Sequence, residues 1–83
     1  MTTAAHATIK ALAAAGGFGC DGDVMQAMGG RSLTAANVND AIASSTSCEV
    51  CPMGYRLTSV DVHGDPIIIE LRLEPAPVVL GLG

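Results

Sequence analysis

The sequence predicts a small α+β domain made of three short helices followed by an antiparallel β-hairpin. Apolar residues recur every three or four positions in the first half of the chain, as on one face of a helix. In residues 67–73 they recur every two positions, as in a half-buried strand. With 83 residues the chain has room for one domain. We therefore expect a single domain over residues 1–83, with a helical part at 4–45, a hairpin at 54–74 and an apolar tail at 75–83.

The first helix is expected at residues 4–15. This segment is rich in alanine, a strong helix former, and Ile9, Leu12 and Ala13 fall on one helical face. The glycine pair at 16–17 follows directly. Because glycine readily adopts the left-handed conformation on which helices commonly end, the helix should end there.

A short second helix is expected at residues 23–28. Asp21 or Asp23 can accept a hydrogen bond from a free N–H group of its first turn. The helix should end at the glycine pair 29–30. Its apolar positions keep the helical spacing: Val24, Met25 and Met28.

The third helix is expected to begin with Thr34 as its N-cap and to end in the serine and threonine run at 44–47. Val38, Ala41 and Ile42 share one face and should point into the core. The polar residues of the helix should face solvent: Asn37, Asn39 and Asp40.

The hairpin is predicted by residues 67–73, whose odd-numbered positions are all apolar, and by residues 55–62, which are rich in strand formers. Residues 63–66 between them carry turn formers. The apolar positions of the first strand change parity partway along, which predicts a bulge near Thr58 and Ser59.

Prolines at 75 and 77 should end the last strand. The residues that follow, Val78, Val79 and Leu80, are too apolar for a solvated tail, and we expect them to pack on another subunit. The strand at 67–73 would then remain uncovered, as an edge open to a partner.

The order of elements resembles the winged-helix variety of the helix-turn-helix superfamily. The resemblance covers residues 4–74 and rests on element order and apolar spacing. It implies a three-helix fold with a wing, and DNA binding as the function of the family. The segments that carry it are 9–12 in the first helix, 23–28 in the second, the tight turn 29–33, and 34–42 in the recognition position.

Composition argues against an enzyme and against a membrane protein. A chain this small leaves little room for an enclosed active site, and no base stands near a nucleophile in a legible pattern. No apolar run approaches the roughly 18–20 residues of a spanning helix. The odd number of cysteines, three, favours a reducing compartment, so we expect a cytoplasmic protein.

The favoured hypothesis is a non-catalytic protein-interaction or regulatory module without a cofactor. Its formal net charge of −4 favours a protein partner, and self-association as a homodimer fits the apolar tail. Such a chain could be a small inhibitor that occupies a surface of a larger machine, as those encoded by viruses and mobile elements do. The expected contact residues are Ile68, Glu70, Arg72, Val78, Val79 and Leu80.

One alternative is a dimeric DNA-binding transcription regulator, as the winged-helix resemblance implies. The helix in the recognition position carries no lysine or arginine, so the acidic charge disfavours this alternative. Asparagine can still read adenine in the major groove. The expected contact residues are Asn37 and Asn39 for bases, and Arg31, Arg56 and Arg72 for phosphates.

A second alternative is a thiol or zinc site at the Cys48 and Cys51 pair. Two thiolates separated by two residues can bind one metal ion at a tetrahedral angle. The pair supplies only half of such a site. Cys20 and His63 are the candidates to complete it.

Overall fold

The computed structural model describes residues 3–83 and contains three helices and a five-stranded sheet within that range. The predicted α+β class and the three helices are confirmed. The helices are α1 (Thr3–Ala14), α2 (Gly22–Gly30) and α3 (Ala35–Ala43). The strands are β1 (Gly19–Cys20), β2 (Ser47–Cys51), β3 (Gly54–Val60), β4 (Pro66–Arg72) and β5 (Val78–Leu82).

The helices begin and end at the residues that carry the capping signals. Gly16, with φ of +71°, follows the end of α1 in the left-handed region. The Asp21 carboxylate accepts a hydrogen bond from the Val24 N–H group at 2.9 Å and caps α2. At α3, the Thr34 hydroxyl accepts from the Asn37 N–H group, and the Asn37 side chain accepts from the Thr34 N–H group, which completes a capping box.

The sheet has the strand order β1-β5-β4-β3-β2. β1 runs parallel to β5, and all other neighbours are antiparallel. The predicted hairpin is the β3–β4 pair, and two further pieces of chain extend it. Residues 47–51, which the sequence analysis assigned neither to the helical part nor to the hairpin, form β2, and the expected tail forms β5. The prediction of a simple hairpin is therefore wrong in extent.

The prediction of an uncovered strand at 67–73 is also wrong. β4 pairs with β3 on one side and with β5 on the other, so it lies inside the sheet. The apolar tail provides the missing partner, because Val79 is fully buried opposite Leu71. Folding back onto β4 buries the tail within its own subunit.

The bulge expected at Thr58 and Ser59 is absent, since β3 and β4 pair without interruption. The parity conflict is resolved by burying Ser59, which is 4% exposed, and leaving Val60 53% exposed. The Ser59 hydroxyl donates to the Ala41 carbonyl oxygen at 2.6 Å, so it is satisfied against α3. The irregular register lies instead between Glu70 and Leu71, where β4 meets β5.

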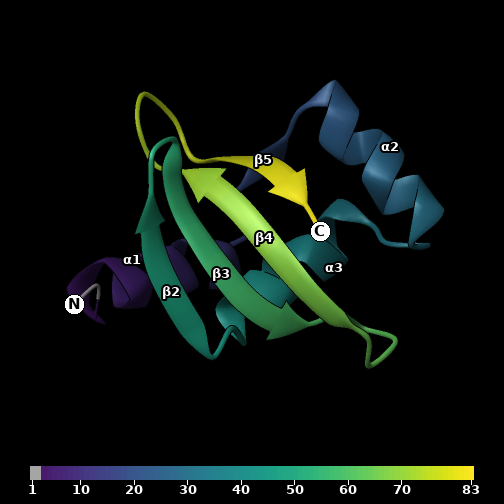
Figure 1. The fold of residues 1–83 in the computed structure, drawn as a ribbon, viewed down its shortest axis with the longest axis horizontal. Coiled ribbons are helices and arrows are strands. Elements are labelled where there is room, and N and C mark those ends of the chain that lie inside the picture. Colours follow the sequence, from purple (N-terminus) through teal and green to yellow (C-terminus); the bar gives the residue numbers. More distant parts are fainter. Residues whose placement is uncertain (1–2) are drawn as a thin grey trace.

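The helices cover one face of the sheet. Figure 1 shows β2, β3 and β4 side by side at the front, α1 and α3 behind them, and α2 next to β5. The core lies between the two layers. Most of the apolar residues predicted from helical and strand spacing are buried there, but Met25 is 62% exposed and Leu12 is only partly buried. Asn39, which was expected to face solvent, is 5% exposed. Buried from the strands are Leu57, Ile67, Ile69, Leu71 and Val79, and from the helices Ile9, Ala13, Val24, Met28, Val38, Ala41 and Ile42.

Candidate functional site

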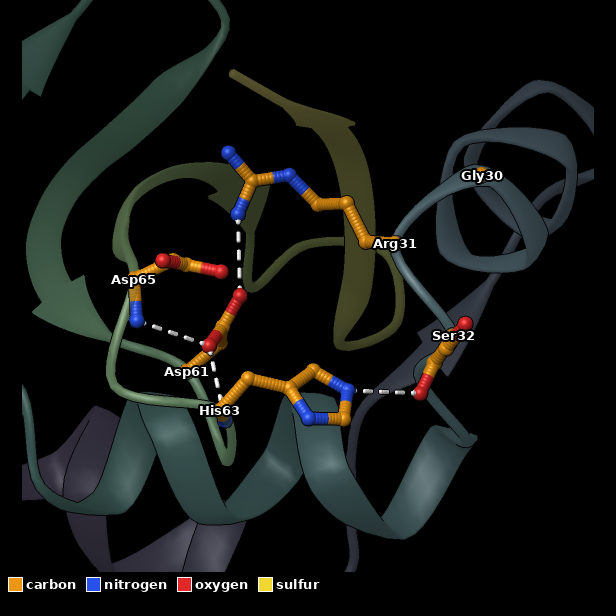
Figure 2. A pocket seen from close by; sticks show the side chains of 6 residues that line it. All are labelled: Gly30, Arg31, Ser32, Asp61, His63 and Asp65. Carbon is orange, nitrogen blue, oxygen red and sulfur yellow. Dashed lines mark hydrogen bonds and ion pairs between the residues drawn. The ribbon is translucent and has the colours of Figure 1, made fainter.

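An open depression of about 510 Å³ lies where the α2–α3 turn meets the β3–β4 turn. Figure 2 shows that Arg31 and Ser32 enter it from the α2–α3 turn, and Asp61, His63 and Asp65 from the β3–β4 turn. The Arg31 guanidinium forms an ion pair with the Asp61 carboxylate at 3.2 Å. It also donates to the carbonyl oxygens of Pro66, at 3.3 Å, and Gly83, at 3.1 Å. Arg31 thus ties the helical layer to the end of β5.

Asp61 is the buried anion of this cluster, with a side chain only 2% exposed. Its Oδ1 accepts hydrogen bonds from the N–H groups of His63, at 2.9 Å, and Asp65, at 3.0 Å. Burial acts to raise the pKa of Asp61. The two backbone hydrogen bonds and the nearby charges of His63 and Arg31 outweigh burial, so the pKa lies below its ordinary value. Asp61 therefore stays ionised and holds the turn together.

The chemistry available in this depression is limited. The His63 Nε2 lies 3.1 Å from the Ser32 carbonyl oxygen, to which its N–H donates. The Asp61 carboxylate is saturated by Arg31 and by the turn backbone. No nucleophilic side chain contacts the His63 ring among the contacts of residues 3–83. The cluster therefore has the bonding pattern of a structural clasp rather than of a catalytic site.

The sheet face opposite the helices is the second candidate site. We call it the open face. Two of its apolar residues are exposed, Val60 by 53% and Ile68 by 44%, and Val78 is half-buried. In the next row, Arg56 and Glu70 form an ion pair at 3.6 Å with both side chains nearly half exposed. By strand register the side chains of the open face are those of Ser47, Glu49, Cys51, Arg56, Thr58, Val60, Ile68, Glu70, Arg72 and Val78.

A second hollow, of about 360 Å³, lies at the end of the sheet where the β2–β3 turn meets the end of β4. We call it the Arg72 pocket; it is lined by Met53, Gly54, Tyr55, Arg72, Leu73 and Glu74. Gly54 has φ of +153°, and the Leu71 carbonyl oxygen lies where a Cβ atom would stand. Only glycine lets the turn approach β4 this closely.

The predicted partner-binding residues are partly gathered by the fold. Ile68, Glu70, Arg72 and Val78 share the open face. Val79 faces the helices instead and is fully buried. Leu80 is the extra residue at the irregular register between β4 and β5, and it is half-buried.

The residues predicted to contact nucleic acid are dispersed. The assignment of Asn39 to base edges is wrong, because its amide is buried and bonded to the Phe18 backbone. The side chain of Asn37 completes the capping box of α3. Arg31 is bound to Asp61, and Arg56 is paired with Glu70 on the opposite side of the sheet from α3.

The residues predicted to bind zinc are not brought together. Cys48 and Cys51 lie three positions apart in β2, which separates their Cα atoms by about 10 Å and places them on opposite faces. Cys20 lies in β1, at the other edge of the sheet, and His63 lies in the β3–β4 turn. Within residues 3–83, no three side chains of His, Cys, Asp or Glu form a group that could hold a metal ion.

Sequence reasoning missed Asp61, Val60 and the Arg72 pocket. The role of Asp61 could have been predicted from the sequence. An aspartate at the start of a turn that contains a glycine, here Gly64, commonly accepts hydrogen bonds from the backbone N–H groups that follow. The exposure of Val60 follows from the burial of Ser59, which only the packing of α3 on β3 decides. The pocket had no signal, since it depends on how Gly54 meets β4.

Comparisons with known proteins assign neither a family nor a function to this chain. No protein-family model, curated protein or solved structure matched this chain. In the described part of the chain, no helix combines the length and hydropathy that crossing a membrane requires.

Proposed function

We propose that this chain is a non-catalytic interaction module that binds a partner protein through the open face. The observation that carries the proposal is a sheet covered by helices on one side only, with Val60 and Ile68 exposed on the other. The partner is a protein surface that combines an apolar strip with an acidic group. Binding would act by occupying the partner's surface, as a regulator or inhibitor does, without chemical change.

The apolar part of the open face supports this function. Val60 pairs with Pro66, and Ile68 lies in the adjacent row opposite Thr58, so the apolar side chains form one patch near the β3–β4 turn. Covering such side chains removes apolar surface from water, which favours association. Cross-strand pairing holds the patch in place, so little ordering is needed on binding.

Arg72 supports an acidic group on the partner. Arg56 is neutralised by Glu70 at 3.6 Å. Arg72 has no carboxylate within 4.0 Å among the described residues, so it is the arginine of this face without an ion pair; the exposed Glu49, opposite Arg56 on β2, has no ion pair either. Two copies of the chain would each carry a formal net charge of −4, which disfavours self-association relative to association with a less acidic protein surface.

The DNA-binding alternative has less support. A regulator of the winged-helix kind would present its third helix to the major groove. In α3, the Asn39 side chain is bonded to the Phe18 backbone in the core, and the Asn37 side chain belongs to the capping box. The helix carries no basic residue. No observation on the structure favours this function over protein binding.

The test is site-specific photo-crosslinking in lysate of the source organism. A photoreactive residue replaces Thr58 on the open face, and in the control it replaces Thr8, which is exposed on α1. Both photoreactive proteins are also made with Ile68→Asp. The matched control is Val62→Asp, because Val62 lies in the β3–β4 connection and is 62% exposed. Circular dichroism checks that every variant folds.

We expect a defined protein to crosslink at position 58, to be lost in Ile68→Asp and to be retained in Val62→Asp. Equal crosslinking at positions 58 and 8, or no effect of Ile68→Asp, would contradict the proposal. Sedimentation of the purified chain tests whether a second copy of the chain binds the open face instead. A dimer that Ile68→Asp dissociates would assign the open face to a second copy and would overturn the choice of a different protein.

A further inference from the structure

We propose that the Arg72 pocket receives a carboxylate group of the partner, with Arg72 as its anchor. This inference rests on the proposed function and adds the chemistry of the group that is recognised. The pocket has a volume of about 360 Å³ and lies at the end of the sheet, where the β2–β3 turn meets the end of β4. Its lining combines Arg72 and Glu74 with the apolar residues Met53, Tyr55 and Leu73.

The chain itself supplies no counter-charge to Arg72. Arg72 is half-buried, and its Nε atom is shielded from solvent without a hydrogen-bond partner. The other arginines on the sheet and at the α2–α3 turn each have a carboxylate within 4.0 Å. A half-buried guanidinium without a counter-charge is costly, so a carboxylate that binds its free N–H groups gains a charge-assisted contact.

The neighbours of Arg72 explain why the protein does not supply that carboxylate itself. Glu70 precedes Arg72 on the same face and is engaged with Arg56. Glu74 lines the pocket but is exposed and lies more than 4.0 Å from the guanidinium, as the absence of a Glu74–Arg72 ion pair in the described residues indicates. Gly54 faces Arg72 across the strands and contributes no side chain. Space beside the arginine is therefore left for a group from outside.

The open face also indicates what accompanies the carboxylate. Ile68 and Arg72 lie four positions apart on β4, which is about 13 Å along a strand. An extended segment that places an apolar side chain over Ile68 would have an acidic group four residues away at the Arg72 pocket. An acidic side chain or a chain-terminal carboxylate would both provide the required chemistry.

Three pentapeptides serve as probes on the full chain labelled with ¹⁵N. All begin with an acetylated isoleucine and carry threonines at their centre. One ends in an amidated glutamate, one in a glutamine with a free terminal carboxylate, and one in an amidated glutamine. The readout is the shift of the Arg72 Nε–H resonance and the dissociation constant for each peptide.

We expect the Arg72 resonance to shift with at least one carboxylate peptide and not with the neutral peptide. A shift with the glutamate peptide alone assigns an acidic side chain. A shift with the free acid alone assigns a chain end, and a shift with both assigns the shared chemistry. Arg72→Gln should weaken carboxylate binding by about 10- to 100-fold, the range expected for a hydrogen bond to a charged group.

Two further variants test whether the effect is specific to the guanidinium of Arg72. Arg72→Lys keeps the charge but not the forked donor geometry, so it should restore only part of the affinity. Arg56→Lys changes an arginine of the same face but keeps the positive charge that engages Glu70, and it should leave the preference for a carboxylate intact. Equal binding of all three peptides to the unmodified chain, or equal loss in Arg56→Lys and Arg72→Gln, would overturn the inference.

The outcome is separable from that of the crosslinking test. If the peptides show no carboxylate preference while Ile68→Asp still abolishes crosslinking, the open face binds a partner and only the role of the Arg72 pocket is wrong. If the peptides show the preference but crosslinking is indifferent to Ile68→Asp, the pocket binds carboxylates and the open face is not the partner surface.

Discussion

The side-chain amide of Asn39 forms a pair of hydrogen bonds with the backbone of Phe18. Its Oδ1 accepts from the Phe18 N–H group at 3.1 Å, and its Nδ2 donates to the Phe18 carbonyl oxygen at 3.1 Å. Nδ2 also donates to the Ala35 carbonyl oxygen at 3.0 Å. An amide on α3 therefore satisfies the backbone of the segment that leads into β1, where Phe18 itself is buried.

Asn39→Ala should strongly destabilise the domain. The substitution leaves the N–H and carbonyl groups of Phe18 buried without partners, and each such group costs about 1–3 kcal/mol. Asp40→Ala, at the exposed neighbouring position of α3, should change the unfolding free energy by less than about 0.5 kcal/mol. Urea unfolding followed by circular dichroism measures both. Equal stability of the two variants would contradict the structural role of Asn39.

The burial of β5 predicts a contrast between adjacent residues. Val79 is fully buried opposite Leu71, whereas Val78 is half-buried on the open face. Val79→Thr places a hydroxyl in the core and should cost about 1–3 kcal/mol, the usual penalty for a buried polar group without a partner. Val78→Thr should cost less than about 1 kcal/mol. If both valines tolerate threonine equally, the tail does not form the inner strand described here.

Because β5 is part of the folded sheet, deleting the tail should unfold the domain. Deleting residues 76–83 would remove β5 and expose the flank of β4, so we expect the shortened chain to lose its cooperative unfolding transition in urea. Loss of partner binding in such a deletion would then report unfolding rather than a contact. A shortened chain that unfolds cooperatively near the wild-type urea midpoint would show that β5 is dispensable.

The local elements could be predicted from the sequence because their signals are local. Glycine at 16, Asp21 and Thr34 act within one helical turn of their own positions, and each marks a helix end in the structure. The alternation from Ile67 to Leu71 identified the buried face of β4, because a strand repeats every two residues. These parts of the fold required no knowledge of what packs against them.

The sheet order and the candidate site could not be predicted because they depend on distant contacts. Whether β4 is an edge is decided by Val78–Leu82, which folds back across a loop that contains two prolines. Whether Asn39 faces solvent depends on Phe18, 21 positions away. A polar residue on a helix is usually exposed. It is buried instead when its side chain forms hydrogen bonds with a backbone segment that has no other partner.

His6 should make the stability of the domain sensitive to pH near neutrality. Its Nε2 donates to the Ser45 hydroxyl oxygen at 2.8 Å, since that hydroxyl itself donates to the Ile42 carbonyl oxygen at 2.7 Å. Burial lowers the pKa of His6 below its ordinary value, and the charge of Lys10 lowers the pKa further. As the pH falls below about 6.5, the unfolded chain takes up the proton first, so the unfolding free energy decreases.

An NMR titration of the His6 ring measures this effect directly. We expect a midpoint below the ordinary value of 6.5, and a higher midpoint in Lys10→Gln, where the repelling charge is gone. His6→Gln should flatten the decline in unfolding free energy between about pH 7 and pH 5. A His6 midpoint at or above 6.5 would refute the assignment.

Asp61 should act in a separate, acidic range. Its pKa is lowered in the folded state, so the folded chain releases the proton more readily than the unfolded chain does. The resulting stabilisation is complete above about pH 4 and is lost as the pH falls through the folded pKa. Asp61→Asn should therefore show a smaller loss of unfolding free energy below pH 4. A carboxyl titration of Asp61 with a midpoint above its ordinary range would contradict the clasp described for Arg31.

Mixed-sequence duplex DNA should not bind this protein, even at low salt. Affinity for a duplex comes largely from cations that neutralise phosphates. Here Arg31 is neutralised by Asp61 and Arg56 by Glu70, within a chain of net charge −4. Fluorescence anisotropy at low and near-physiological salt measures the affinity, with Arg31→Ala as the comparison. Tight binding that weakens with salt and is reduced in Arg31→Ala would show that the ion pair with Asp61 opens for phosphate. That result would favour the DNA-binding alternative over a protein partner.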